Sequence, residues 1–172
     1  MDRTLSAAMI DPVQFRQVLG HYPTGVCVVT AVRDDGEAVA MVVGSFTSVS
    51  LSPPLVGFFP DKASSSWAKL RTCRHFCVNI LAATQQEVCR QLASKHPDKF
   101  AGTPHVLSDA GVPLLHDVVA RIECAMGTIV DAGDHEMVLG HVHTLEVVSG
   151  EPPLMFWQGG YGAFVPQAVA NA

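Results

Sequence analysis

A run of three serines gives the first chemical signal, because it stands directly before a segment that is expected to be helical. The helix is expected over residues 67–72, with Trp67 and Leu70 directed inward. Four small residues precede it: Ala63, Ser64, Ser65 and Ser66. Free N–H groups and hydroxyls at the start of a helix suit an anion such as phosphate. Serine is also a common N-cap residue, so simple capping of the helix explains the same pattern.

Two histidines that alternate along an expected strand could share a metal ion. His141 and His143 point to the same face of an extended chain, because side chains repeat every second residue. Glu146, a carboxylate close by in the chain, falls on the opposite face at that period. A metal-dependent barrel that uses His141 and His143 stays as an alternative. Two partly exposed strand histidines explain the pattern more simply, and no metal ligand is assigned.

A third histidine lies at the tip of an expected hairpin. Gly133 and Asp134 are turn residues, and they place His135 where it could reach over a neighbouring pocket. The sequence contains no G-x-S-x-G nucleophile motif, no P-loop and no G-x-G-x-x-G dinucleotide fingerprint. The chemical signals are therefore an anion site and isolated polar side chains, without an obvious catalytic dyad.

The stretch 40–54 combines a buried strand with a run of short hydroxyl side chains. It reads AMVVGSFTSVSLSPP, so it is apolar and β-branched at first, then small and polar, and it ends at two prolines. Backbone N–H groups and small side chains at the end of a buried strand let a flat polar ligand lie against the main chain. This stretch is therefore predicted to be a ligand-binding edge.

The elements that would carry these residues are mostly strands joined by hairpins. Asp11 and Pro12 predict the start of a helix that Gly20 ends. Its inner face would be formed by Phe15, Val18 and Leu19. Strands are expected at residues 26–32, 37–46, 55–59, 76–81, 118–130, 136–148 and, as an extended piece, 152–157. A capping box at Thr84 opens another helix, and residues 102–115 are expected to be irregular. The pattern indicates a mainly β antiparallel barrel with a few short helices.

The length and composition predict one domain without a nucleic-acid or membrane partner. The 172 residues fit a single domain over residues 1–172, with flexible ends at 1–10 and 165–172. A net charge of −5 offers no basic patch for nucleic acid, and no apolar run is long enough to span a membrane. The N-terminal segment lacks the pattern of a signal peptide, so a cytoplasmic protein is expected.

The low charge content indicates more buried surface than one chain needs. Only 16% of the residues are charged and 48% are hydrophobic, with a mean hydropathy of +0.27. An average domain has about 25% charged residues, so a close homodimer would account for the difference. The five cysteines form no C-x-x-C pair, and buried reduced thiols are expected at Cys27, Cys73, Cys77, Cys89 and Cys124.

Seven short motifs follow one another along nearly the whole chain, over about residues 15–161. The motifs are Phe15-x-x-x-Leu19-Gly20-x-x-Pro23-Thr24-Gly25-Val26; Met41-x-x-x-Ser45-Phe46-Thr47-Ser48-Val49-Ser50-Leu51-x-Pro53-Pro54; Ser64-Ser65-Ser66; Phe76-x-Val78-Asn79-x-Leu81; Asp98-Lys99-Phe100-x-Gly102; Gly133-Asp134-His135 with Gly140-x-Val142; and Pro153-Leu154 to Gly160-Tyr161. Each motif alone is weak. Together and in this order, they resemble the short-chain flavin reductases, the small components of two-component flavin-dependent monooxygenases.

The resemblance implies an FMN-binding split β-barrel, antiparallel and Greek-key-like, that forms a homodimer. Family members bind FMN or FAD and take a hydride from NADH or NADPH, and the reduced flavin leaves for a partner monooxygenase. No arginine cluster marks a 2′-phosphate site, which favours NADH here. The implied cofactor-binding residues are Val43, Gly44, Ser45, Phe46, Thr47, Ser48, Ser50, Ala63, Ser64, Ser65, Ser66, Asn79, Leu81, Lys99 and Phe100. The implied nicotinamide side consists of Thr24, Gly25, Tyr161 and His135, which would position the nicotinamide.

Two positions depart from the family pattern, which commonly has Thr and a small polar residue where this chain has Val42 and Gly44. A hydroxyl contact to flavin is expected to be missing at each position, while Gly44 would let the ligand approach the backbone more closely. Flavin affinity and the choice between FMN and FAD are thereby left open. A flavoprotein of the same fold that keeps its flavin, as an oxidase or a binding module, is a further alternative, and so is a non-enzymatic interaction domain.

Overall fold

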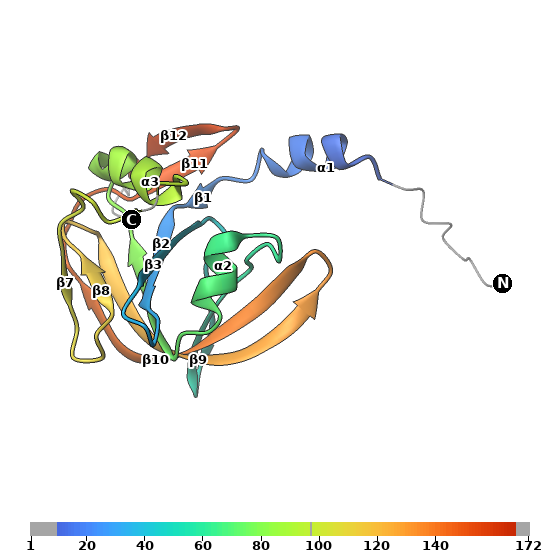
Figure 1. The fold of residues 1–172 in the computed structure, drawn as a ribbon. Helices are drawn as coiled ribbons and strands as arrows, with labels where there is room; N and C mark the ends of the chain where they lie inside the picture. The colour runs from blue at the N-terminus through green and yellow to red at the C-terminus, as the bar shows by residue number, and fades with distance from the viewer. Residues whose placement is uncertain (1–9, 97, 168–172) are drawn as a thin grey trace.

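The computed structural model describes residues 10–96 and 98–167, which form mostly antiparallel strands (Figure 1). The strands are β1 Thr24–Gly25, β2 Cys27–Val32, β3 Ala38–Val43, β4 Thr47–Leu51, β5 Pro54–Phe58, β6 His75–Ile80, β7 His105–Leu107, β8 Pro113–Leu115, β9 Ala120–Ala132, β10 His135–Val147, β11 Leu154–Trp157 and β12 Gly160–Ala163. The helices are α1 Pro12–Leu19, α2 Ser65–Leu70, α3 Gln86–Ala93 and the 3-10 turn η1 Ala83–Gln85. Within the described ranges, no helix has the length and apolar character that crossing a membrane requires. Most of the ends expected to be flexible, residues 1–9 and 168–172, lie outside the described residues.

Seven strands form one sheet in the order β3-β2-β6-β9-β10-β5-β4, and every pairing in it is antiparallel. β3 and β4 lie at opposite edges of this sheet, yet only residues 44–46 separate them in the chain. Four residue steps span at most about 14 Å, whereas six strand spacings of a flat sheet would cover about 29 Å. The sheet therefore has to curl until its edges meet, and residues 44–46, here called the seam, close it. The predicted mainly β barrel is confirmed.

The interior of the barrel is filled mainly by aliphatic side chains, with three aromatic rings packed together among them. Phe58 packs edge-on against Trp67 and Phe76, with ring centroids 6.0 and 5.6 Å apart. All three are buried, and Trp67 belongs to α2, which lies in the hollow of the curved sheet (Figure 1). Its indole Nε1 donates to Glu136 Oε2 at 2.6 Å. The helix that follows the serine run is thereby fixed to the long strand β10.

A second apolar cluster packs β2 and β3 against helix α3. Its buried members are Val26, Val28, Ala40, Leu81, Cys89, Leu92, Leu115, Val118 and Leu154. Val42, Phe100 and Tyr161 are partly buried and pack against the cluster. The cluster therefore holds α3 against β3, the strand that continues into the seam.

Four local expectations are wrong. Thr84 does not cap a helix, because it lies inside η1, where the Ala82 N–H donates to Gln85 Oε1 at 3.0 Å. Residues 102–115 are not irregular throughout, because they contain the hairpin of β7 and β8, whose three-residue strands are too short to give a readable pattern. The hydroxyl run after the seam is itself a strand, β4, with four of its five residues exposed. Helix α2 begins at Ser65 rather than residue 67, since Ser64 Oγ accepts a hydrogen bond from the Trp67 N–H and caps it.

The inner face expected for α1 is largely exposed within the described part of the chain. The start of the helix is as predicted, because the Val13 N–H donates to Asp11 Oδ1 at 3.1 Å. Phe15, Val18 and Leu19 are nevertheless 52%, 60% and 53% exposed. Figure 1 shows the helix projecting away from the sheets. Its apolar face is available for packing against another molecule.

The five cysteines are buried thiols without disulfide partners, as predicted. Burial raises the pKa of Cys27, Cys77 and Cys124 to about 12. Thiolate is the reactive form of cysteine, so these three side chains stay protonated and inert at neutral pH.

Candidate functional site

A cleft of about 750 Å³ opens between the start of α2, strand β3 and the loop after α3. We call it the serine cleft. It brings together six of the residues assigned to cofactor binding: Ala63, Ser64, Ser65, Ser66, Lys99 and Phe100. The serines and Lys99 lie more than thirty positions apart in the chain, so the tertiary fold and not the local sequence joins them.

Lys99 is the central polar group of the serine cleft. Its Nζ donates to Ser66 Oγ at 2.9 Å and to the Ala40 carbonyl at 3.3 Å. Burial, and to a lesser extent the charge of Lys69, lowers the pKa of Lys99. Within the described residues Lys99 forms no ion pair, so its charge is met only by neutral oxygens. A partly buried, uncompensated ammonium group attracts an anion.

One of the other two lysines that line the serine cleft, Lys69, is neutralised by the protein itself. Lys69 Nζ donates to Glu37 Oε1 at 2.5 Å, and Arg33 donates to the other oxygen of the same carboxylate at 2.7 Å. These bonds, with that from Lys69 the larger, lower the pKa of Glu37. Lys69 is therefore less available to an incoming anion than Lys99.

A smaller pocket of about 180 Å³ lies at the seam, and we call it the seam pocket. It is lined by Thr24, Val26, Val42, Val43, Gly44, Phe156 and Tyr161. Phe156 and Tyr161 form an edge-to-face pair with centroids 5.3 Å apart. Strand β3 connects the two cavities, because its residues 38–40 border the serine cleft and Val42 and Val43 border the seam pocket.

Gly44 has a structural role besides the ligand contact expected of it. A Cβ atom at this position would lie 2.9 Å from Thr24 Oγ1, which is closer than van der Waals contact allows. The space that the glycine leaves free is therefore taken by the Thr24 side chain and is not left open for a ligand. Gly44 thus fixes β1 against the end of β3 and sets the shape of the seam pocket.

The hydroxyl-rich stretch after Gly44 is largely engaged in closing the barrel. The Ser45 hydroxyl accepts a hydrogen bond from the Phe59 N–H at 2.9 Å and lies 3.3 Å from the Phe59 carbonyl. Phe46 packs against the barrel core. The remaining assigned residues, Thr47, Ser48 and Ser50, belong to β4, an edge strand that pairs only with β5 among the described strands.

His135 pairs with Asp61, just before the serine run of residues 63–66, and does not line the seam pocket. Its Nδ1 is 2.7 Å from Asp134 Oδ1, and this contact lowers the pKa of Asp134. The hairpin tip is tied down by Lys62, whose Nζ donates to Asp131 Oδ2 and to the Gly133 carbonyl. Among the described residues, neither the serine cleft nor the seam pocket has His135 in its lining. Gly25, also assigned to the nicotinamide side, follows the pocket residue Thr24 in β1.

The structure places two of the assigned residues in the core, away from both cavities. The Asn79 side chain is buried and donates to the Val28 carbonyl at 3.1 Å and to Thr30 Oγ1 at 3.0 Å. Its Oδ1 accepts a hydrogen bond from the Leu115 N–H at 3.0 Å. Leu81 is buried in the second apolar cluster. Both residues connect strands beneath the site and have no surface that a cofactor could touch.

The two histidines considered for metal binding have different neighbours. The His141 ring packs beside Gly127, and the His143 ring faces His75 with centroids 6.2 Å apart. Glu146 instead pairs with Arg121 at 3.1 Å. Over residues 10–96 and 98–167, no group of three or more His, Cys, Asp or Glu side chains has the arrangement that a metal ion needs.

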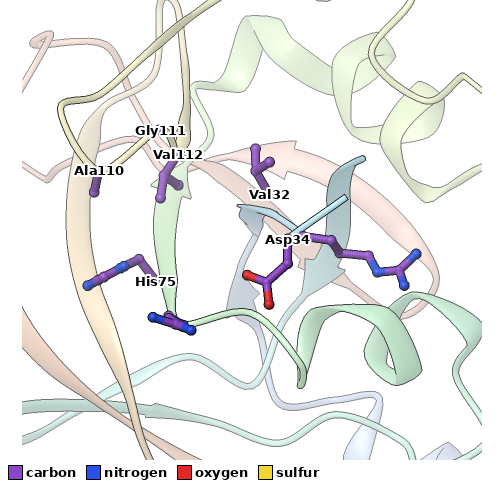
Figure 2. A pocket seen from close by; sticks show the side chains of 8 residues that line it. Val32, Asp34, His75, Ala110, Gly111 and Val112 are labelled. Carbon is purple, nitrogen blue, oxygen red and sulfur yellow. The ribbon is translucent and has the colours of Figure 1, made fainter. Parts of the chain in front are cut away.

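A further cavity of about 380 Å³ lies between the β2–β3 turn, the start of β6 and the β7–β8 turn (Figure 2). Asp34 and His75 face it, together with Arg33 and Arg74. Arg33 is already paired with Asp35 and Glu37 at 3.1 and 2.7 Å. Arg33 is thus largely neutralised, and the other two charged side chains of the cavity, Asp34 and Arg74, have opposite signs. The cavity therefore favours neither an anion nor a cation.

The sequence pattern did not assign Phe156 or Lys69 to the site, although Phe156 lines the seam pocket and Lys69 lines the serine cleft. Phe156 could have been found from the alternation of residues 154–157, since it lies opposite Thr24 in the pairing of β1 and β11. Lys69 lies three residues after Ser66, on the same side of a helix. Neither signal is strong without the fold.

The comparison with known proteins agrees with this arrangement. The chain matches the family model described as "Flavin reductase like domain" over residues 19–164. A flavin reductase of Pseudomonas putida is 53% identical over 155 residues, covering 90% of this chain and 91% of that protein. The flavin-dependent monooxygenase reductase subunit HsaB of Rhodococcus jostii is 42% identical over 171 residues, covering 99% of this chain and 87% of that protein.

A solved structure extends the likeness to three dimensions. It is the NADH:FAD oxidoreductase of Streptomyces globisporus C-1027 in complex with NAD and FAD fragments, with a TM-score of 0.86 and 37% identity. The match covers 95% of this chain and 100% of that chain. Fold, motif order and sequence identity agree, and the chain belongs to the flavin reductase like domain family.

Proposed function

We propose that this protein is an NAD(P)H:flavin oxidoreductase of the EC 1.5.1 type, which passes a hydride from NADH, or NADPH, to FMN or FAD. The observation that carries the proposal is the position of Lys99, whose Nζ contacts both Ser66 Oγ and the carbonyl of Ala40. Ala40 belongs to β3, which runs from the serine cleft to the seam pocket. FMN has a phosphate at one end and a flat ring at the other, and FAD contains the same unit, so two cavities joined by one strand suit both.

The serine cleft would hold the flavin phosphate. Lys99 supplies a positive charge there, and the hydroxyls of Ser65 and Ser66 supply hydrogen-bond donors. Ser64 is engaged as the N-cap of α2, so its main contribution is to fix the loop. Phe100 lines the cleft next to Lys99 and offers an apolar surface to the rest of the ligand.

The backbone of Val43 to Ser48 would contact the isoalloxazine ring. Ser45 already uses its hydroxyl on Phe59, so main-chain groups would provide the polar contacts at the seam. A flavin supplies the hydride-accepting chemistry when it is bound. The protein has to orient two rings and keep water out, and this needs no general acid or base. The lack of a catalytic dyad in the sequence fits that requirement.

Thr24, Gly25 and Tyr161 would form the nicotinamide side, at and beside the seam pocket. His135 would approach the nicotinamide nucleotide from the hairpin tip, where Lys62 and Asp134 hold it. Thr24 and Gly25 lie on β1, Tyr161 lies on β12 and His135 lies on β10, so three strands would contribute to the nicotinamide side.

The partner would be a flavin-dependent monooxygenase that receives diffusible reduced flavin. The relative from Rhodococcus jostii, a reductase subunit, supports this. A homodimer is proposed from the exposed apolar face of α1, because an isolated helix of eight residues is marginal in water unless it packs against something. We place the protein in the cytoplasm.

The test is the oxidation of NADH and of NADPH, measured separately with added FMN, FAD and riboflavin. We expect stimulation by FMN or FAD, and faster turnover with NADH than with NADPH. The proposal is lost if no flavin stimulates turnover. A protein that stays yellow through purification and shows no such activity would instead be a flavoprotein that keeps its flavin.

A further inference from the structure

We propose that Cys89 is a positioning residue, whose buried sulfur anchors the hydroxyl of Tyr161 and thereby holds the Tyr161 ring as a wall of the seam pocket. The inference rests on the proposed function, in which this pocket lies on the nicotinamide side. It assigns a role to one thiol that neither the motif pattern nor the cofactor-binding residues include.

The two ends of the tyrosine side chain have different surroundings. The ring lines the seam pocket together with Phe156. The hydroxyl lies 3.4 Å from Cys89 Sγ, and Cys89 has no exposed surface. The Tyr161 side chain therefore runs from the pocket into the second apolar cluster, and the sulfur is the polar partner at its inner end.

The backbone that carries Tyr161 gives the ring little support. Strand β12 reads GYGA, so a glycine lies on each side of the tyrosine, and it pairs only with β11 among the described strands. Glycines within a strand weaken it and offer no side chain for packing. The preceding turn contains Gln158 and Gly159, both with positive φ. The position of the ring therefore depends on side-chain contacts, chiefly those with Phe156 and Cys89.

The anchor comes from an element that also borders the serine cleft. Cys89 lies in the middle of α3, which packs on β3, and the last residue of the helix, Ala93, lines that cleft with Ser94. Through Cys89, the helix beside the phosphate end of the site thus also fixes the wall at the ring end. Loss of the anchor is expected to disturb the ring end first.

Both partners are uncharged at neutral pH. Burial raises the pKa of the Cys89 thiol, and the contact with Cys89 raises the pKa of the Tyr161 phenol. The contact is therefore a weak neutral hydrogen bond between a thiol and a hydroxyl. A serine at position 89 could form the same bond, which gives the test a conservative variant.

The kinetic test compares Cys89→Ala, Cys89→Ser and, as a matched control, Cys124→Ala, which empties another buried cysteine site in the barrel core. We expect Cys89→Ala to raise the KM for NADH about three- to tenfold, the range of a lost neutral hydrogen bond. The KM for FMN and kcat should change much less. Cys89→Ser should restore the KM for NADH. An unchanged KM for NADH in Cys89→Ala, or the same rise in Cys124→Ala, overturns the proposal.

A second measurement does not depend on turnover. The chain has two tyrosines, and replacing the exposed Tyr22 by Phe leaves Tyr161 as the single phenol. Spectroscopic titration of the phenolate in this background should show a lower pKa for Tyr161 after Cys89→Ala and not after Cys124→Ala. If the pKa of Tyr161 is the same with and without Cys89→Ala, Cys89 does not hold the Tyr161 hydroxyl and the proposal is overturned. This readout separates the two proposals, because a protein without flavin reductase activity would still report on the contact.

Discussion

The ammonium group of Lys99 and the hydroxyl of Ser66 lie 2.9 Å apart across the serine cleft, although 33 positions separate them in the sequence. Lys99 belongs to the loop after α3, and Ser66 lies in the first turn of α2. The contact therefore joins two separate walls of the cleft. This pair is where the proposed phosphate site can be tested most directly.

Replacement of Lys99 by glutamine should weaken the binding of FMN about 10- to 100-fold, because a hydrogen bond to a charged group is lost. Riboflavin has no phosphate, so its dissociation constant should change little. Fluorescence quenching of each flavin on binding measures both values with one variant. An equal loss of affinity for FMN and riboflavin would mean that Lys99 does not meet the phosphate.

Gly44→Ala should destabilise the protein by about 1–3 kcal/mol, the usual effect of overpacking, because the new Cβ meets Thr24 Oγ1 at 2.9 Å. Thr24→Ala removes the opposing atom, so the double variant should be less destabilised than the sum of the single effects. Urea unfolding of the four proteins measures this coupling. Simple additivity would show that the two side chains do not compete for one space.

His135→Ala should raise the KM for the nicotinamide nucleotide more than the KM for flavin, because the proposed role of His135 is to position the nicotinamide. His143→Ala provides the matched control, since His143 is also on β10 but lies next to His75. Steady-state kinetics with each substrate varied in turn measures the split. A similar effect on both KM values would remove the assigned role.

Asn79→Ala should destabilise the fold by about 1–3 kcal/mol or more, because the buried Leu115 N–H loses its acceptor and Val28 and Thr30 lose a donor. The dissociation constant for FMN, measured where the variant remains folded, should be close to that of the wild type. The resemblance to flavin reductases implied a cofactor contact at Asn79, and a large loss of FMN affinity without loss of stability would restore that interpretation.

Stability should fall in acid partly through Glu37. Hydrogen bonds from Lys69 and then Arg33 lower its pKa in the folded protein below the ordinary value of 4.5. The stabilisation that Glu37 provides is therefore complete at pH values above the ordinary pKa of 4.5. It is lost as the pH falls through the lowered pKa of the folded protein. Urea unfolding at a series of pH values should show Glu37→Gln less stable than the wild type near neutrality, with the difference vanishing in acid.

Glu151→Gln is the control for the acid series, since its carboxylate forms no ion pair within the described residues. A constant difference between Glu37→Gln and the wild type down to strongly acidic pH would contradict the assignment of the pH dependence to this carboxylate.

Local patterns predicted the elements whose cause is local. The caps at Asp11 and Ser64 depend on a few neighbouring residues, and both form the expected hydrogen bond to the backbone. The long strands β9 and β10 have enough alternation to be recognised. The hairpin of β7 and β8 has only three residues in each strand, and no periodicity can be read over that length.

The candidate site could be predicted in part, because the order of its motifs along the chain resembles that of a known family. The spacing could not show that Asn79 points into the core while Ser66 faces a cleft, since both are polar residues beside apolar ones. It also could not show that Thr24 takes the space beside Gly44, because that contact joins β1, of the three-stranded sheet β1-β11-β12, to the residue after β3 of the seven-stranded sheet. Such facts depend on the packing of distant segments.

The seam has a consequence for redesign. Residues 44–46 complete the circumference of the barrel, and the same backbone is the proposed contact surface for the flavin ring. An insertion or deletion there would alter the closure of the sheet as well as the ligand preference. Changes in the binding of the ring should therefore be sought at the side chains of Val42, Phe156 and Tyr161, which border the pocket from β3 and from the separate sheet of β11 and β12.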